Sequence, residues 1–304
     1  MRASRAIGLY VAAVILLGSL LAPGLFWAVQ EIAPRVSALH VYATYPFHRI
    51  YDRSILLVAL VGLWPLLRAI GFRFWSDIGY VRARGWWRHL LAGYVFGILT
   101  LTAMVAILVV FGGHRLVVTK TSEQMAGAGA KFLFVGVVVA LIEETLFRGA
   151  LQGALQRRLP VAIAIVVASA VYSLAHFLKP AGVNIPADQV TWTSGGKCLA
   201  WIVTQSMRQK GVTVEFVSLL LVGCVLGLAY DRTRAIYLPL GLHAGWVLVN
   251  ELMRWGAALD VTQDPASWPM LVALLVLVFW LCQKVLAPLR GPGPSRSGRV
   301  APST

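Results

Sequence analysis

Long apolar runs separated by short polar connections repeat along the chain. A transmembrane helix needs about 20 predominantly apolar residues to cross the hydrocarbon core of a bilayer. Eight runs fit this requirement, near residues 7–29, 54–72, 90–112, 131–156, 160–178, 214–230, 236–254 and 268–287. The pattern therefore predicts an all-α fold, a polytopic integral membrane helical bundle with about eight transmembrane helices.

The composition favours a membrane protein and argues against a nucleic-acid partner. Hydrophobic residues make up 59% and charged residues 13% of the chain, and the mean hydropathy is +0.75. Soluble domains carry about 25% charged residues. The net charge of +15 comes from Lys and Arg placed in ones and twos beside apolar runs, not in basic blocks. We expect membrane lipid as a partner and no nucleic acid.

The connections indicate an orientation. With eight spans, Lys and Arg are slightly more frequent on the side that holds both termini, so the positive-inside rule favours cytoplasmic termini. The Ala-, Arg- and Gly-rich composition is compatible with a bacterial source, and we expect the bacterial inner membrane. The long connection 179–213 contains apolar residues at helical spacing, which predicts a helix that lies along the membrane surface. Its apolar face consists of Leu199, Ile202, Val203 and Met207.

Ionisable residues interrupt three of the apolar runs. Glu143 and Glu144 lie in the stretch ALIEETLFRGAL, residues 140–151, and His176 and His243 lie in two later runs. An ionisable side chain at the centre of a transmembrane helix costs about 2.5 kcal/mol or more, and such residues normally face the bundle interior. These four side chains therefore predict a functional site inside the membrane.

Helical spacing distinguishes the two glutamates. Glu144 and Arg148 are four residues apart, so they share a helix face in the favourable order for an ion pair. Glu143 is turned about 100° away and has no basic partner on its own helix. Desolvation and the neighbouring carboxylate disfavour its charged form, which suits a general base. Our hypothesis is that Glu144 and Arg148 form an ion pair that supports the structure, and that Glu143 takes part in the reaction.

Depth along the helices predicts which groups meet. Glu143 lies sixteen residues before the tight turn at Leu159, and His176 lies sixteen residues after Pro160. Both side chains are therefore about 24 Å from this turn and are expected to face each other. His243 is only about eight residues from the preceding connection, so its depth agrees less well unless its helix begins late or is tilted.

Three short motifs carry a family resemblance. EETLFR (143–148) fits E-E-x-x-x-R, YSLAH (172–176) fits aromatic-x-x-x-His, and HAGWV (243–247) falls where a His-x-x-x-Asn motif is expected. In this order they resemble the CPBP, or Abi, family of intramembrane proteases, which includes the type II CAAX prenyl endopeptidases. The resemblance covers roughly residues 120–255. It divides the chain into N-terminal transmembrane helices (1–119), this protease core, a C-terminal transmembrane helix (256–290) and a disordered tail (291–304).

The resemblance implies an intramembrane endopeptidase that hydrolyses a peptide bond of a membrane-embedded or lipidated protein. In such an enzyme Glu143 and His176 activate a water molecule. Glu144 and Arg148 support the site, and His243 helps to stabilise the oxyanion.

The third motif departs from the family pattern. The position four residues after His243 is Val247 where an asparagine is expected. Asn250 lies seven residues after His243, on about the same helix face, and is the candidate substitute. Tyr172, the aromatic residue of the second motif, is a further supporting residue.

The sequence leaves alternatives open for both the cofactor and the function. A glutamate and two histidines can supply a base, an oxyanion donor and an acid. For the family that the motifs resemble we favour a metal-free glutamate mechanism, which implies no cofactor. The same Glu143, His176 and His243 match a catalytic zinc set, so zinc is the alternative. The alternatives to proteolysis are a catalytically silent immunity or binding protein of the membrane and a proton-coupled transporter. The sequence leaves the oligomeric state open.

Overall fold

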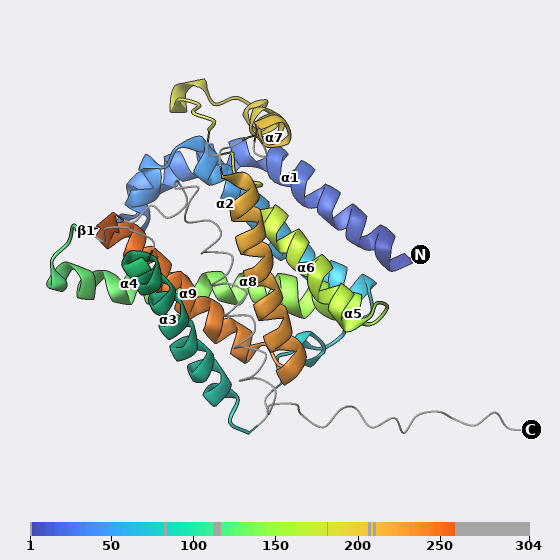
Figure 1. Ribbon diagram of the computed structural model, residues 1–304. Coiled ribbons are helices and arrows are strands. Elements are labelled where there is room, and N and C mark those ends of the chain that lie inside the picture. The colour runs from blue at the N-terminus through green and yellow to red at the C-terminus, as the bar shows by residue number, and fades with distance from the viewer. Residues whose placement is uncertain are drawn as a thin grey trace, which may run out of the picture. The chain divides into compact units, whose positions relative to one another are not determined.

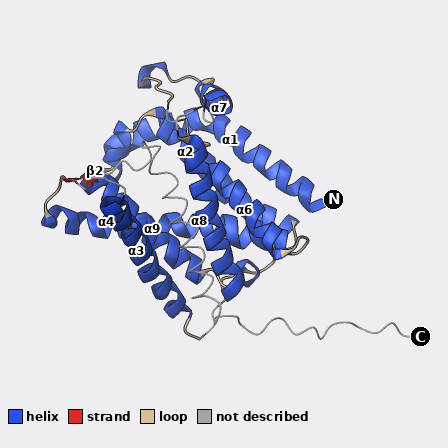
Figure 2. Ribbon diagram, viewed as in Figure 1, coloured by secondary structure: helices blue, strands red, loops and turns tan. Residues whose placement is uncertain are grey.

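The computed structural model describes residues 2–81, 84–111, 117–180, 182–205, 208 and 211–258. These residues are almost entirely helical, apart from one short pair of strands (Figure 2), which confirms the all-α fold. The elements are α1 (Arg2–Ile32), η1 (Ala33–Arg35), η2 (Ser37–Thr44), α2 (Phe47–Ala69), η3 (Trp75–Ile78), α3 (Trp86–Phe111), β1 (Val117–Val118), α4 (Ser122–Glu144), η4 (Thr145–Gln152), α5 (Gly153–Gln156), α6 (Val161–His176), η5 (Ala187–Gln189), α7 (Ser194–Gln205), α8 (Val212–Thr233), α9 (Tyr237–Gly256) and β2 (Ala257–Ala258).

Several of these helices are suited to cross a membrane. Among the described residues, five are long and apolar enough, and they cover Arg5–Arg35, Phe47–Ala69, Trp86–Phe111, Ser122–Gln156 and Val212–Thr233. Helix α6 is apolar but has only 16 residues. The predicted run 268–287 and the tail 291–304 lie outside the described residues. The chain is therefore a multi-pass membrane protein, while the count of eight spans and the cytoplasmic termini stay predictions.

The chain forms two compact units, which are described one at a time. The first comprises Met1–Asp77 and Ala170–Leu219, and the second comprises Ile78–Ser169 and Leu220–Thr304. Helices α6 and α8 each contribute residues to both units. The division predicted from the sequence concerns functional segments, so its boundaries stay predictions.

In the first unit α1 packs against α2 and α7 (Figure 1). The helix predicted in the connection 179–213 exists as α7, while its place along the membrane surface stays a prediction and Met207 lies outside the described residues. Cys198 and Ile202 point into the core, whereas Val203 is 75% exposed. Gly195 lets α7 approach α1, because a Cβ at this position would collide with the Ser19 carbonyl. Helix α7 is therefore held in the core of this unit by its Cys198–Ile202 face.

In the second unit α9 packs against α3 and α4 (Figure 1). Two pairs of glycines spaced by four residues meet where α3 and α9 cross, Gly93 and Gly97 on α3 and Gly241 and Gly245 on α9. A Cβ added at any of these glycines would collide with the backbone of the partner helix. Small residues at such spacing let helix backbones approach closely in a membrane. The crossing fixes α9, which carries His243, two residues after Gly241.

We expect Gly241→Ala to lower the free energy of unfolding by about 1–3 kcal/mol, because the new methyl group would lie against the Leu90 carbonyl. Gly127→Ala on α4 is the matched control, since nothing lies within 4 Å of an added Cβ there. Thermal unfolding of the purified protein in detergent measures both. An equal loss in the two variants would contradict the close crossing of α3 and α9.

Candidate active site

The glutamate pair lies where one long helix changes its geometry. A capping box of Thr121 and Gln124 starts α4, and Glu143 and Glu144 are its last two residues. The chain continues directly into η4, which is a π-helix over Thr145–Gln152. Segments of π-helix are rare and are frequent at functional sites. The junction therefore places both carboxylates at an irregular part of the membrane-spanning helix.

Glu144 is fully buried and contacts two basic side chains. Its Oε1 lies 3.2 Å from Arg148 Nη1, so the ion pair predicted from the spacing is present. The same oxygen accepts a hydrogen bond of 2.7 Å from His243 Nδ1. Glu144 therefore joins Arg148 of its own helix to His243 of α9.

A row of polar side chains extends from this pair toward α8. Arg148 Nη2 donates a hydrogen bond of 3.3 Å to the Gly223 carbonyl, and Gln152 Nε2 donates one of 2.9 Å to the Gly227 carbonyl. Gly227 leaves room for the Gln152 side chain, whereas Gly223 leaves room for Ser169 of α6. A Cβ at Gly227 would lie 2.7 Å from Gln152 Oε1. These bonds hold the π-helix against α8.

Sequence reasoning missed this row, although a signal was present. Glu144, Arg148, Gln152 and Gln156 recur at every fourth residue, which is the spacing of one helix face. The last of them, Gln156, donates to Asp231 Oδ1 at 3.4 Å. A polar stripe inside a predicted span indicates a protein-facing surface, and we had used only its first two members.

His243 lies between the two glutamates. Its Nδ1 is bound by Glu144, and its Nε2 lies 3.8 Å from Glu143 Oε2. The contact brings His243 to the depth of Glu144, which residue counting allowed only if its helix begins late or is tilted. Helices α4 and α9 approach so closely that a Cβ at Gly136 would lie 2.9 Å from the Ala244 carbonyl.

Tyr80 is a second residue that the sequence did not reveal. Thr145 Oγ1 donates to the Leu141 carbonyl at 2.5 Å, so the Tyr80 hydroxyl donates to Thr145 Oγ1 across 2.6 Å. Burial raises the pKa of the Tyr80 phenol, and the negative charge of Glu144 contributes to the rise. Tyr80 therefore remains a hydrogen-bond donor at neutral pH, beside the residue that follows the glutamate pair. It precedes α3 in a connection without a recognisable pattern.

Tyr172 and His176 belong to the first unit. His176 is the last residue of α6, and its Nδ1 donates a hydrogen bond of 3.0 Å to the Tyr172 carbonyl. The ring of Tyr172, which is buried, lies edge-on to the imidazole with the ring centroids 4.6 Å apart. The bond leaves Nε2 of a neutral His176 as a hydrogen-bond acceptor. Because Glu143 belongs to the second unit, its meeting with His176 stays a prediction.

The two remaining positions of the third motif lie further along α9. Val247 is half-buried and faces α4, with its Cβ 3.5 Å from a Cβ placed at Gly136. Asn250 is exposed, about 10 Å along the helix from His243. The structure therefore gives Val247 a packing contact with α4, and the supporting role of Asn250 stays a prediction.

The donors predicted for a metal are divided between the units. Glu143 and His243 face each other in the second unit, and the contact of His243 with Glu144 is common for metal-ligating histidines. His176, the third predicted ligand, belongs to the first unit. Within the described residues, no group of three His, Cys, Asp or Glu side chains is placed to hold a metal ion. The absence of a cofactor stays a prediction, and zinc stays the alternative.

The fold and the site together define a multi-pass membrane protein with a cluster of two glutamates, an arginine and a histidine, of which all but the partly exposed Glu143 are buried. A family model described as type II CAAX prenyl endopeptidase Rce1-like matches residues 126–249. The matched region includes all three motifs and is less than half of the chain, and it confirms the resemblance that the motifs indicate. This family suggests a protease of the CAAX prenyl endopeptidase type. No curated protein and no solved structure matches the chain.

Proposed function

We propose that the chain is an intramembrane endopeptidase that hydrolyses a peptide bond of a membrane-embedded or lipidated protein. The observation that carries the proposal is the position of His243, held by Glu144 on one side and facing Glu143 on the other. The match of residues 126–249 to an Rce1-like model supports the same chemistry. The substrate is expected to enter as a helix between loosely packed spans and to unwind near His176.

Glu143 acts as the general base in this proposal. Its side chain is 25% exposed, whereas that of Glu144 is fully buried against Arg148 and His243. The 3.8 Å between Glu143 Oε2 and His243 Nε2 exceeds a hydrogen bond. In the proposal, entry of substrate gives an oxygen of water or substrate access to both atoms, because Oε2 is otherwise buried. Glu143 takes a proton from the attacking water and passes it to the leaving amine. The acceptor Nε2 of His176 helps to orient that water.

His243 stabilises the oxyanion. Glu144 accepts the Nδ1 proton, so a protonated His243 presents its Nε2 proton on the side of Glu143. In that state Glu143, Glu144, Arg148 and His243 carry no net charge together, which lowers the cost of placing them in the membrane. A donor directed at the developing oxyanion stabilises the transition state more than the substrate.

We expect His243→Asn to lower the cleavage rate at saturating substrate by a factor of about 10²–10³, the usual effect of removing one oxyanion donor. The exposed His40→Gln is the control, with an expected rate equal to that of the wild type. The measurement is the initial rate of product formation in vesicles. A change in KM alone would indicate that His243 binds substrate without acting on the transition state.

Membrane proteomes test the function itself. Terminal peptides from cells that carry the wild-type chain are compared with those from cells that carry Glu143→Gln. We expect at least one membrane protein to accumulate uncleaved only with Glu143→Gln. The control Glu123→Gln, at the exposed start of the same helix, should leave cleavage intact. If no uncleaved protein accumulates under any growth condition, the protease function is contradicted.

A further inference from the structure

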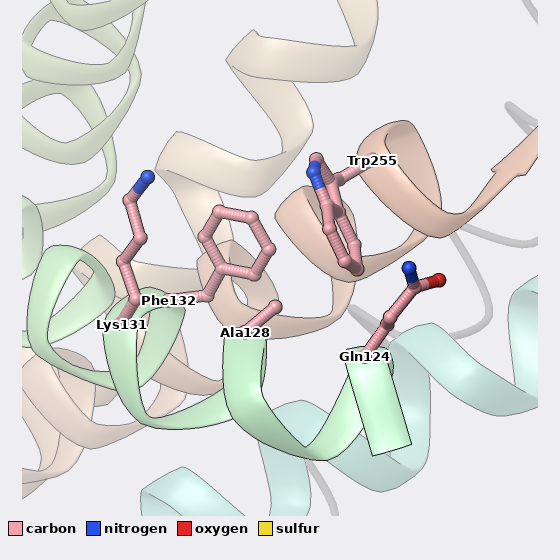
Figure 3. A pocket seen from close by; sticks show the side chains of 5 residues that line it. All are labelled: Gln124, Ala128, Lys131, Phe132 and Trp255. Carbon is pink, nitrogen blue, oxygen red and sulfur yellow. The ribbon is translucent and has the colours of Figure 1, made fainter. Parts of the chain in front are cut away.

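A separate pocket opens in the second unit between the start of α4 and the end of α9 (Figure 3). Its volume is about 300 Å³, and its lining comprises Gln124, Ala128, Lys131, Phe132 and Trp255. The strand pair β1–β2 ties the segment before α4 to the end of α9 beside it. The glutamate pair is about eleven residues further along the same helix, so the pocket is distinct from the candidate active site.

The walls of the pocket are aromatic, one lysine lines it, and a second lysine, Lys120, lies beside it over Trp255. The rings of Phe132 and Trp255 pack edge to face with their centroids 6.0 Å apart. Lys120 Nζ lies 5.3 Å from the Trp255 centroid, and Lys131 Nζ lies 6.0 Å from that of Phe132. None of the lining residues, all of which are in the described part of the chain, is acidic. The pocket therefore suits a ligand that combines negative charge with apolar surface.

The pocket also lies at one end of a candidate membrane span, where we expect the bilayer to change from polar to apolar. It lies at the first turns of the candidate span Ser122–Gln156, and Trp255 is the penultimate residue of α9, as is typical of aromatic residues at the membrane interface. Further along α4 the surface is apolar and exposed, at Phe134 and at Val138, two turns beyond Lys131. A lipid whose charged headgroup occupies the pocket could therefore lay its acyl chains along the apolar surface of α4.

We propose that this pocket binds an anionic phospholipid. The phosphate lies at the mouth of the pocket beside the Lys131 ammonium group, Lys120 adds positive charge next to Trp255, and the glycerol and first methylene groups pack on Phe132 and Trp255. Basic pockets between transmembrane helices bind acidic lipid headgroups in this way. A zwitterionic headgroup brings its own cation toward the two lysines, and a free phosphate leaves the aromatic walls uncovered. The charge and the apolar walls together favour the anionic lipid.

Native mass spectrometry of the full-length protein, released from detergent with added phosphatidylglycerol or phosphatidylcholine, tests the proposal. Lys120→Gln with Lys131→Gln should weaken phosphatidylglycerol binding about 30-fold and leave phosphatidylcholine binding unchanged. Arg68→Gln with Arg88→Gln is the matched control, because it also removes two positive charges that lie over aromatic rings. Each arginine lies 5.5 Å from the centroid of a tryptophan ring of its own helix, α2 or α3, away from the pocket. This control should bind phosphatidylglycerol as the wild type does.

A second variant separates the shape of the pocket from its charge. Ala128→Trp fills the cavity without removing a charge, and it too should weaken phosphatidylglycerol binding. Retained binding in both pocket variants, or an equal loss in the arginine control, would overturn the proposal. The proposal would also be overturned if inorganic phosphate displaced the bound lipid at a concentration as low as that at which added phosphatidylglycerol does. The pocket would then recognise phosphate alone.

Discussion

Glu143→Gln is expected to lower the cleavage rate by a factor of about 10³–10⁴ without unfolding the protein. The amide has nearly the shape of the carboxylate but cannot take a proton from water, and general-base catalysis contributes about 10²–10⁴ to a rate. Glu143 is partly exposed and faces Nε2 of His243, so little packing depends on its charge. The measurement is the initial cleavage rate in vesicles, together with the midpoint of thermal unfolding.

Glu144→Gln is the informative comparison for this experiment. Glu144 holds Arg148 and His243, so its substitution should disturb folding and activity together. Activity that survives Glu143→Gln but is abolished by Glu144→Gln in a normally folded protein would reverse the roles of the two glutamates.

Arg148→Met is expected to lower the free energy of unfolding by about 3–5 kcal/mol. Removing one partner of a buried ion pair leaves the other charge uncompensated. Arg148 and Glu144 are both almost completely buried, and Arg148 also binds the Gly223 carbonyl of α8. Denaturant unfolding in mixed micelles measures the loss.

The double variant Glu144→Gln with Arg148→Met checks the cause of that loss. With both charges removed, part of the stability should return relative to Arg148→Met alone. A loss below about 1 kcal/mol for Arg148→Met would mean that the pair behaves like an exposed salt bridge, which contradicts its burial.

Local features of the fold and site were predictable from the sequence. Helices depend on runs of apolar residues, and the Glu144–Arg148 pair depends on a four-residue spacing within one helix. For α7, spacing predicted the helix and included Ile202 of its buried face. Which neighbouring residues are buried depends on α1, and spacing alone placed Val203 on the apolar face although it is exposed.

Contacts between distant segments were not predictable in the same way. His243 meets Glu144 across 99 residues, and Tyr80 meets Thr145 across 65. Such contacts depend on where helices cross, and the crossing of α3 with α9 depends on four glycines that read individually as ordinary helix residues. Motif order indicated that His243 belongs with the glutamates, while depth counting allowed it only if its helix begins late or is tilted, and the geometry agrees with the motif.

The central claim is that Glu143 directs water onto a peptide bond, and oxygen labelling tests it most directly. Membranes from cells that carry Glu143→Gln, in which substrates remain uncleaved, are incubated with reconstituted wild-type protein in H₂¹⁸O, and new carboxyl termini are identified by mass spectrometry. We predict new termini that carry one ¹⁸O with the wild-type protein and none with reconstituted Glu143→Gln. Labelled termini formed equally by both proteins, or by neither, would contradict the claim.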